Sequence, residues 1–168
     1  MIRDMYISGV NYESMVDGEG IRATIYISGC KWGCADCHNP KTHSFTYGER
    51  VTNSFIDEIN SEMLKRPFLS GITLSGGDVM FSADKALNFI DKLNIPNDNI
   101  WIYSGFKWEE IINNPQNDKM ELLKKCNVLV DGLFDKSLKD NTLKFRGSSN
   151  QRIIDIQKSL NQNKVILY

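Results

Sequence analysis

The sequence predicts an α/β fold, an open, partial (β/α) barrel of about five or six mostly parallel strands. The first observation behind this prediction is that short apolar segments rich in β-branched residues alternate with amphipathic segments of helical period. The second is length, because a complete eight-unit barrel needs about 250 residues and this chain has 168. Since an ordinary domain has roughly 100–200 residues, residues 1–168 are expected to form a single domain.

The expected elements follow one another in alternation. Strands are expected in segments with many β-branched or aromatic residues, namely 21–28, 71–75, 99–105, 127–134 and 164–168. Helices are expected where apolar residues recur at helical spacing, namely 52–66, 82–94, 107–114 and 118–126. Thr52 or Ser54 is a candidate N-cap of the first helix, and Pro115 should break the helical region after residue 107. No element is assigned to the polar stretches before residue 21 and at 135–152.

Composition and charge exclude several classes of protein. The net charge is −1 and the isoelectric point is near 6.1, so no global field favours nucleic acid or an anionic membrane. No apolar run approaches the roughly 20 residues of a membrane span. The N-terminal stretch contains Asp and Glu where a secretion signal would need an uninterrupted apolar segment. We therefore expect a cytoplasmic protein without a nucleic-acid or membrane partner, in which clustered thiols bind metal or perform chemistry.

The unusual motifs all follow predicted strands. In parallel α/β architectures the chemistry gathers at the C-terminal ends of the strands. Here those ends read SGCKWGCADC, SGGD, YSG and VDGLF. We expect these four motifs to lie on one rim of the sheet.

Three of the four cysteines are clustered with the spacing C-x3-C-x2-C, and they are Cys30, Cys34 and Cys37. A structural zinc site needs a fourth ligand, for which His38 and His43 are the nearby candidates. A redox dithiol would use Cys34 and Cys37 and leave Cys30 unexplained. Three thiolates on a four-iron cluster would leave one iron open to another ligand. Cluster binding is favoured over three unrelated cysteines, and the remaining Cys126 is expected to be a small buried hydrophobe.

The other rim motifs have structural interpretations as well as functional ones. SGGD is a tight turn by default, but paired glycines also let backbone approach a ligand closely, and Asp78 could pair with a cationic amine. YSG and VDG are turns at strand ends by default. The later segment FRGSSNQR carries Arg146 and Arg152, which are expected to be solvated unless they meet an anion or a partner.

The C-x3-C-x2-C motif behind an early strand resembles the signature of the radical S-adenosylmethionine (SAM) enzymes. In that family, SAM chelates the unligated iron of a [4Fe–4S] cluster, and the reduced cluster splits SAM to methionine and a 5′-deoxyadenosyl radical. The resemblance implies a partial barrel of the radical SAM type. It also implies that Cys30, Cys34 and Cys37 are the metal ligands and catalytic residues.

The same resemblance implies a set of SAM-binding residues. Backbone around the third cysteine would run beside the adenine, although Asp36 stands where the family often has an aromatic residue. SGGD matches the Gly-Gly-Glu segment that holds the methionine amino group, and the ends of YSG and VDG match contacts to the ribose and carboxylate. The implied residues are Asp36, Cys37, His38, Ser75, Gly76, Gly77, Asp78, Ser104 and Asp131.

Taken in order, the motifs from about Gly9 to Ile156 are similar to the family of activating proteins of anaerobic ribonucleoside-triphosphate reductases; Val79 departs from that family's usual Pro. This resemblance implies generation of a glycyl radical on the large reductase subunit, with an electron from reduced flavodoxin or a similar donor. Alternatives are an activase of another glycyl-radical enzyme, an enzyme of the 7-carboxy-7-deazaguanine synthase type, and a non-catalytic zinc or iron–sulfur module. Metal and sulfide content would identify a zinc module.

Overall fold

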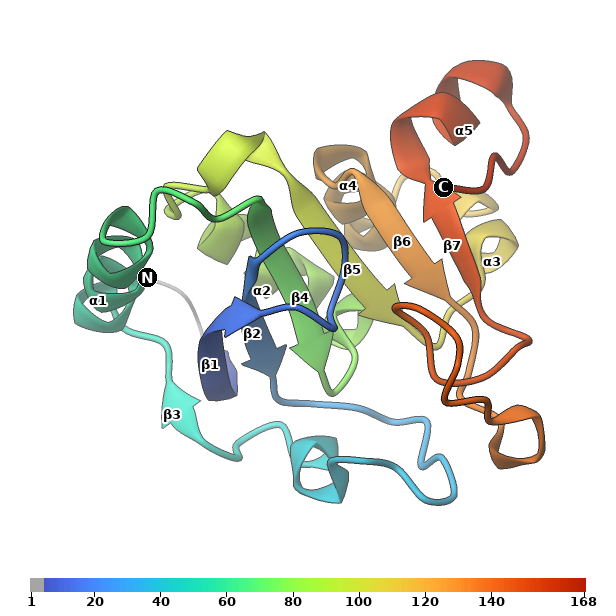
Figure 1. Cartoon of the computed structure of the whole chain (residues 1–168), viewed down its shortest axis with the longest axis horizontal. Coiled ribbons are helices and arrows are strands. Elements are labelled where there is room, and N and C mark those ends of the chain that lie inside the picture. The colour runs from blue at the N-terminus through green and yellow to red at the C-terminus, as the bar shows by residue number, and fades with distance from the viewer. Residues whose placement is uncertain (1–4) are drawn as a thin grey trace.

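The structure is a computed structural model, and it describes residues 5–168. Its centre is one open, seven-stranded sheet with the order β3-β1-β2-β4-β5-β6-β7 (Figure 1). The strands are β1 (Tyr6–Ser14), β2 (Arg22–Ile27), β3 (Glu49–Arg50), β4 (Gly71–Gly76), β5 (Ile100–Ser104), β6 (Val128–Asp131) and β7 (Arg152–Asp155). The α/β class predicted from the sequence is therefore confirmed.

The strand count and the directions of the edge strands differ from the prediction. Strands β2, β4, β5 and β6 run parallel, whereas β1, β3 and β7 are antiparallel to their neighbours. The sheet is thus mixed, with seven strands in place of five or six. Segment 164–168 is not a ladder strand and meets β7 through one isolated bridge, Ile154 with Leu167.

The helices are α1 (Asn53–Leu64), α2 (Ala83–Ile90), α3 (Trp108–Ile112), α4 (Asp118–Lys125) and α5 (Ile156–Gln162). Thr52 is the N-cap of α1, because its hydroxyl accepts a 3.2 Å hydrogen bond from the Phe55 N–H. The predicted break at Pro115 separates α3 from α4. Within residues 5–168, none of the helices combines the length and the apolar character needed to span a bilayer.

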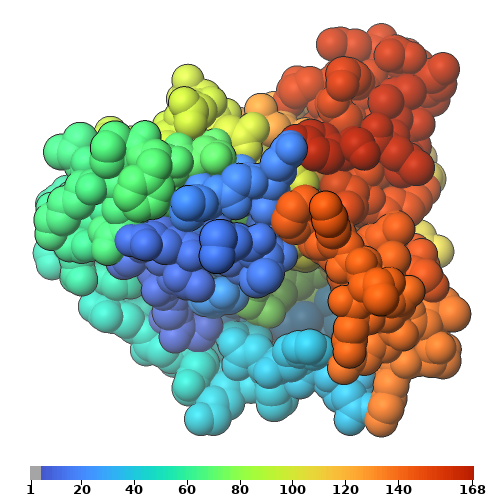
Figure 2. Space-filling view, in the orientation of Figure 1, coloured from blue at the N-terminus to red at the C-terminus, as the bar shows by residue number. Residues whose placement is uncertain are grey.

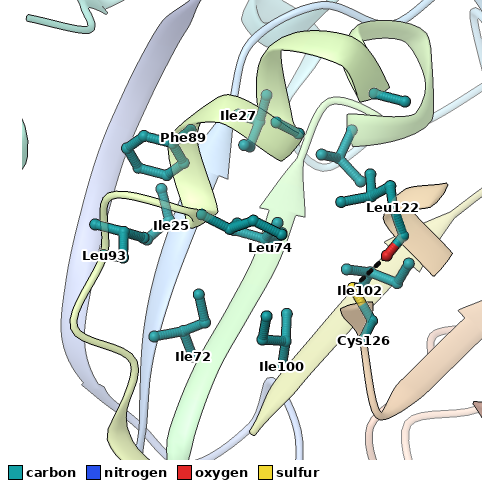
Figure 3. Packing of buried hydrophobic residues seen from close by; sticks show 14 of the residues in the cluster. Ile25, Ile27, Ile72, Leu74, Phe89, Leu93, Ile100, Ile102, Leu122 and Cys126 are labelled. Atoms are coloured by element: carbon teal, nitrogen blue, oxygen red, sulfur yellow. Dashed lines mark hydrogen bonds between the residues drawn. The ribbon is translucent and has the colours of Figure 1, made fainter. Parts of the chain in front are cut away.

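The hydrophobic core lies on one face of the sheet. Side chains of a strand point alternately to its two faces, and Ile25, Ile72 and Ile102 belong to the set that points toward the helices (Figure 3). There they pack with Phe89 of α2 and Leu122 of α4, which are both fully buried. The intervening residues of the strands face the other way, and three of them, Trp101, Val128 and Val130, form a second, smaller buried cluster.

The opposite face is filled at the N-terminal ends of the parallel strands. Arg22, only 1% exposed, donates hydrogen bonds to the Thr73 hydroxyl (2.9 Å) and the Ile72 carbonyl (2.6 Å). Its guanidinium lies 5.4 Å from the centre of the Trp101 ring. The segment VDGEGIR (residues 16–22) therefore supplies a structural arginine at this end. The C-terminal ends of the strands stay open on the same face.

Candidate iron–sulfur site

A cavity of about 410 Å³ lies at the C-terminal ends of the parallel strands. In Figure 2 the molecular surface is hollowed between the blue N-terminal region, the cyan segment around residues 40–47 and the orange segment around residues 139–147. All four rim motifs contribute several residues to the wall of this cavity. The lining residues from these motifs are Cys30, Trp32, Cys34, Cys37, Ser75, Gly76, Gly77, Asp78, Tyr103, Ser104, Gly105, Gly132, Leu133 and Phe134, and His38 follows directly after the first motif.

The three clustered cysteines are free, half-buried and part of one cavity wall. The fourth, Cys126, is fully buried and donates a hydrogen bond to the Leu122 carbonyl at 3.2 Å (Figure 3). Among the described residues, no three Cys, His, Asp or Glu side chains are gathered closely enough to hold one metal ion. A zinc ion requires its ligands to converge on one atom, whereas each cysteine of an iron–sulfur cluster binds a separate iron. The arrangement therefore fits a cluster with three thiolate ligands better than a zinc site.

Burial affects the protonation of these thiols. It raises the pKa of Cys30 to about 11, although a hydrogen bond from the Trp32 backbone opposes the shift. Burial also raises the pKa of Cys34. Because a metal ligand must be a thiolate, cluster loading has to release these protons.

The two glycines of SGGD allow the turn after β4 to press against the segment that carries the cysteines. At Gly76, where φ is +100°, a Cβ would lie 2.7 Å from the Ile27 nitrogen, and at Gly77 it would lie 2.7 Å from the Gly29 carbonyl oxygen. Backbone hydrogen bonds join the same two segments, from the Gly77 N–H to the Ile27 carbonyl (2.7 Å) and from the Asp78 N–H to the Gly29 carbonyl (3.0 Å). The glycine turn and the start of the cysteine segment are therefore one packed unit.

The Asp78 carboxylate is directed into the protein. It accepts hydrogen bonds from the Trp32 indole N–H (2.6 Å), the Ser104 hydroxyl (2.9 Å), the Gly105 N–H (2.9 Å) and the Met80 N–H (3.0 Å). Asp78 is 2% exposed, and burial raises its pKa while the four donors act in the opposite direction. A carboxylate has about four lone-pair sites, so protein donors already occupy this one.

Asp131 lies outside the set of residues that line the cavity. Its Oδ1 accepts a hydrogen bond from Arg152 Nε (2.9 Å), its Oδ2 accepts one from the Trp108 N–H (2.8 Å), and Arg152 also pairs with Glu109. These carboxylates raise the pKa of Arg152. The geometry gives Asp131 a structural role, and its expected contact with SAM stays a prediction.

The expectation that Arg152 is solvated is wrong for the same reason. The other arginine of that segment, Arg146, donates to the Gln151 carbonyl at 2.6 Å. Both arginines therefore help to fold FRGSSNQR back on the sheet, and Gly147 and Gln151 of this segment reach the cavity wall.

The two residues beside the third cysteine, Asp36 and His38, differ in their position relative to the cavity. His38 lines the cavity and makes an edge contact with Phe134, with 5.8 Å between ring centres. Asp36 is exposed, has a left-handed φ of 57° and forms an ion pair with Lys136. Asp36 is not among the lining residues, so of this pair only His38 lines the cavity.

Several lining residues were not singled out from the sequence. Tyr26 and Tyr103 project from β2 and β5 into the cavity; the Tyr26 hydroxyl donates to Asp17 (3.3 Å), and the Tyr103 hydroxyl donates to the Phe145 carbonyl (2.7 Å). Burial raises the pKa of Tyr26 to about 12, so its phenol is protonated at neutral pH. The signal that identifies both tyrosines is the strand alternation itself, because they face away from the isoleucines of the core.

Comparison with known proteins identifies the class of this protein. Residues 16–154 match the family described as a 4Fe-4S single cluster domain, and this match defines the class of the protein. The chain is 37% identical over 145 residues to the anaerobic ribonucleoside-triphosphate reductase-activating protein of Escherichia coli K12, covering 82% of this chain and 90% of that protein.

Two further relatives carry the same name. The protein of Enterobacteria phage T4 is 32% identical over 142 residues, covering 82% of this chain and 86% of the relative. The protein of Vibrio cholerae is 35% identical over 147 residues, covering 83% and 90%. The chain belongs to the family of anaerobic ribonucleoside-triphosphate reductase-activating proteins.

Proposed function

We propose that this protein activates an anaerobic ribonucleotide reductase by generating a glycyl radical on its large subunit, through reductive cleavage of SAM at a [4Fe–4S] cluster. The observation that carries the proposal is the convergence of three free thiols and the glycine turn on one cavity, while Cys126 is buried in the core. The names of the relatives favour the reductase over another glycyl-radical enzyme as the target.

In this proposal Cys30, Cys34 and Cys37 hold the cluster and leave one iron for SAM. When bound and reduced, such a cluster supplies the electron that cleaves SAM to methionine and a 5′-deoxyadenosyl radical, which takes a hydrogen atom from a glycine of the partner. The protein binds and orients the reacting groups, as is general for enzymes whose cofactor performs the difficult chemistry.

Backbone at the end of β4 is available for the methionine end of SAM. The β4–β5 ladder stops at Leu74 and Ile102, whereas the β2–β4 ladder continues to Gly76. On the β5 side, Ser75 and Gly76 therefore have no ladder partner where they line the cavity. Since the Asp78 carboxylate is already occupied, we assign the SAM ammonium to carbonyl oxygens of this turn. Ser104 lines the cavity and donates a hydrogen bond to Asp78. His38 lines the cavity next to Cys37.

The proposal also covers the domain organisation, the cellular compartment and the electron donor. We propose that residues 1–168 act as a single radical SAM domain, that the protein works in the cytoplasm, and that reduced flavodoxin or a similar low-potential donor supplies the electron. Three half-buried free thiols support a reducing compartment, because such thiols persist there.

The test is anaerobic EPR spectroscopy of the protein reconstituted with iron and sulfide and then reduced, with and without SAM. We expect a [4Fe–4S] signal that changes on addition of SAM, and a glycyl radical signal once the large reductase subunit is added. Cys34→Ala should abolish both signals, because it removes a cluster ligand.

Cys126→Ala is the matched control. It removes a buried sulfur at a cost of about 1 kcal/mol of stability, and it should leave the EPR signals intact. Zinc without sulfide, or a cluster that is indifferent to SAM, would support a non-catalytic module. A SAM-responsive cluster that gives no radical on the reductase would support an activase of a different enzyme.

A further inference from the structure

Trp32 lies between Cys30 and Cys34 in the sequence, and its side chain contacts residues of two other segments. Its indole Nε1–H donates a 2.6 Å hydrogen bond to Asp78 Oδ2, across 46 residues of sequence. Its ring packs against Phe81 and Phe106, with 5.4 and 4.7 Å between ring centres. Through this one side chain, the cysteine segment is attached to the turn after β4 and to the residues that follow β5.

The segment around Trp32 has little regular structure of its own. Residues 31–38 contain no helix or strand, and the Cys37 N–H bonds locally to the Cys34 carbonyl at 3.3 Å. The start of the segment is held by backbone bonds from Gly29 and Cys30 to the η1 turn (Pro40–His43). The Trp32 bond reaches from residues 31–38 to the carboxylate that follows the glycine turn. A loop of this kind depends on such contacts for a fixed conformation.

The surrounding residues are arranged to receive the indole. At Gly105 a Cβ would lie 2.5 Å from the Trp32 Nε1 atom, so a larger residue there would displace the indole. The Gly105 N–H and the Ser104 hydroxyl both donate to Asp78, as Trp32 does. Donors from the cysteine segment, from the end of β5 and from the turn after β4 therefore meet at one buried carboxylate, and removal of one donor leaves this acceptor incompletely satisfied.

We propose that Trp32 is a positioning residue, whose hydrogen bond to Asp78 fixes the cysteine segment against the glycine turn and thereby sets the distance between the thiols and the SAM-binding backbone. The part that concerns SAM rests on the function proposed above. The part that concerns the loop depends only on contacts within this chain.

Two substitutions separate the hydrogen bond from the packing of the ring. Trp32→Phe keeps an aromatic ring beside Phe81 and Phe106 but has no N–H. Trp32→His loses the larger ring but keeps the donor, because the imidazole overlays the five-membered ring of indole and its Nε2 takes the place of Nε1. If the hydrogen bond is the important contact, histidine preserves the function of Trp32 and phenylalanine does not.

The first readout is the rate at which trypsin cleaves after Lys31 in the cluster-free, full-length protein, divided by the rate for the same variant unfolded in urea. This ratio follows the population of the open segment. We expect it to rise about tenfold in Trp32→Phe, the effect of losing about 1.4 kcal/mol, and to stay near the wild-type value in Trp32→His.

The second readout is the SAM concentration that gives half of the EPR change in the cluster-loaded protein. We expect it to rise about tenfold in Trp32→Phe, at unchanged iron and sulfide content, and to remain near wild type in Trp32→His. Equal effects of both variants, or no effect of Trp32→Phe on either readout, would overturn the proposal. If the wild-type cluster ignores SAM, the proposed function fails, and the trypsin ratio alone decides whether Trp32 fixes the segment.

Discussion

Asp78 and Asp131 are two buried carboxylates at the C-terminal ends of β4 and β6, which are separated in the sheet by β5. They differ in the groups to which they are hydrogen-bonded. Their exposures are 2% and 1%. Asp78 follows β4, lines the cavity and is bound by four neutral donors. Asp131 ends β6, lies outside the cavity lining and is neutralised by Arg152.

This difference shows what a carboxylate at a strand end can contribute. Neutral donors stabilise the ionised form of Asp78 without cancelling its charge, and no salt bridge to Asp78 occurs among residues 5–168. Burial raises the pKa of Asp78, but in its ionised form this carboxylate would carry a charge that no neighbouring cation cancels, beside the cavity for which we propose SAM, a sulfonium and ammonium ligand. The charge of Asp131 is instead paired directly with the Arg152 guanidinium, which also pairs with Glu109. Burial alone does not distinguish the two roles; the charge of the partners does.

The largest expected effect comes from replacing each carboxylate by its isosteric amide. In Asp78→Asn an NH₂ group would face N–H donors, so we expect a loss of about 3 kcal/mol in the free energy of unfolding and loss of the SAM-induced EPR change. In Asp131→Asn, Arg152 keeps Glu109 as a partner, so we expect a loss of about 1–2 kcal/mol with the SAM response retained.

Urea unfolding and EPR titration with SAM measure these two quantities on the same samples. A normal SAM response in Asp78→Asn would show that the charge of Asp78 is not needed at the cavity. Loss of the response in Asp131→Asn would show that Asp131 is a residue of the site, as the resemblance implies.

The second comparison uses the glycine next to each carboxylate. In Gly77→Ala the Cβ would meet the Gly29 and Thr42 carbonyl oxygens at 2.7 and 3.0 Å, whereas at Gly132 the nearest atom is 3.8 Å away. We expect Gly77→Ala to displace the cysteine segment and to lower the iron and sulfide retained after reconstitution. Gly132→Ala should cost about 1–2 kcal/mol of stability, because its φ is +99°, and should keep the cluster. Equal cluster contents in the two variants would contradict the packing argument.

The central fold could be predicted from the sequence because its signals are local. Strands β2, β4, β5 and β6 are apolar runs, and the amphipathic period of the helices is clear. The edge strands could not be predicted in the same way. β1 contains a glycine and several polar residues, because only part of it is buried, and β3 has just two residues.

The site could be predicted to the level of its motifs. The convergence of the cysteines and SGGD on one cavity follows from the rule that parallel strands end on a common rim. The roles of Asp78 and Asp131 could not be predicted, because they depend on partners that are far away in the sequence. Trp32 is 46 residues from Asp78, and Arg152 is 21 residues from Asp131. No local pattern encodes those pairings.

The smallest expected effect tests the outer part of the Asp131 ion pair. Arg152 holds the pKa of Glu109 below its usual value of 4.5, so this pair stabilises the folded state above pH 4.5 and loses that effect as the pH falls through the lower, folded-state pKa. Since Glu109 is half exposed, Glu109→Gln should lower the free energy of unfolding by about 0.3–0.5 kcal/mol at pH 7, and the difference from wild type should vanish toward pH 3. Urea unfolding at the two pH values measures this. A difference that persists at low pH would mean that Glu109 acts through packing. A loss of the SAM response at pH 7 would mean that the ion pair of Arg152 with Glu109 and Asp131 is part of the site.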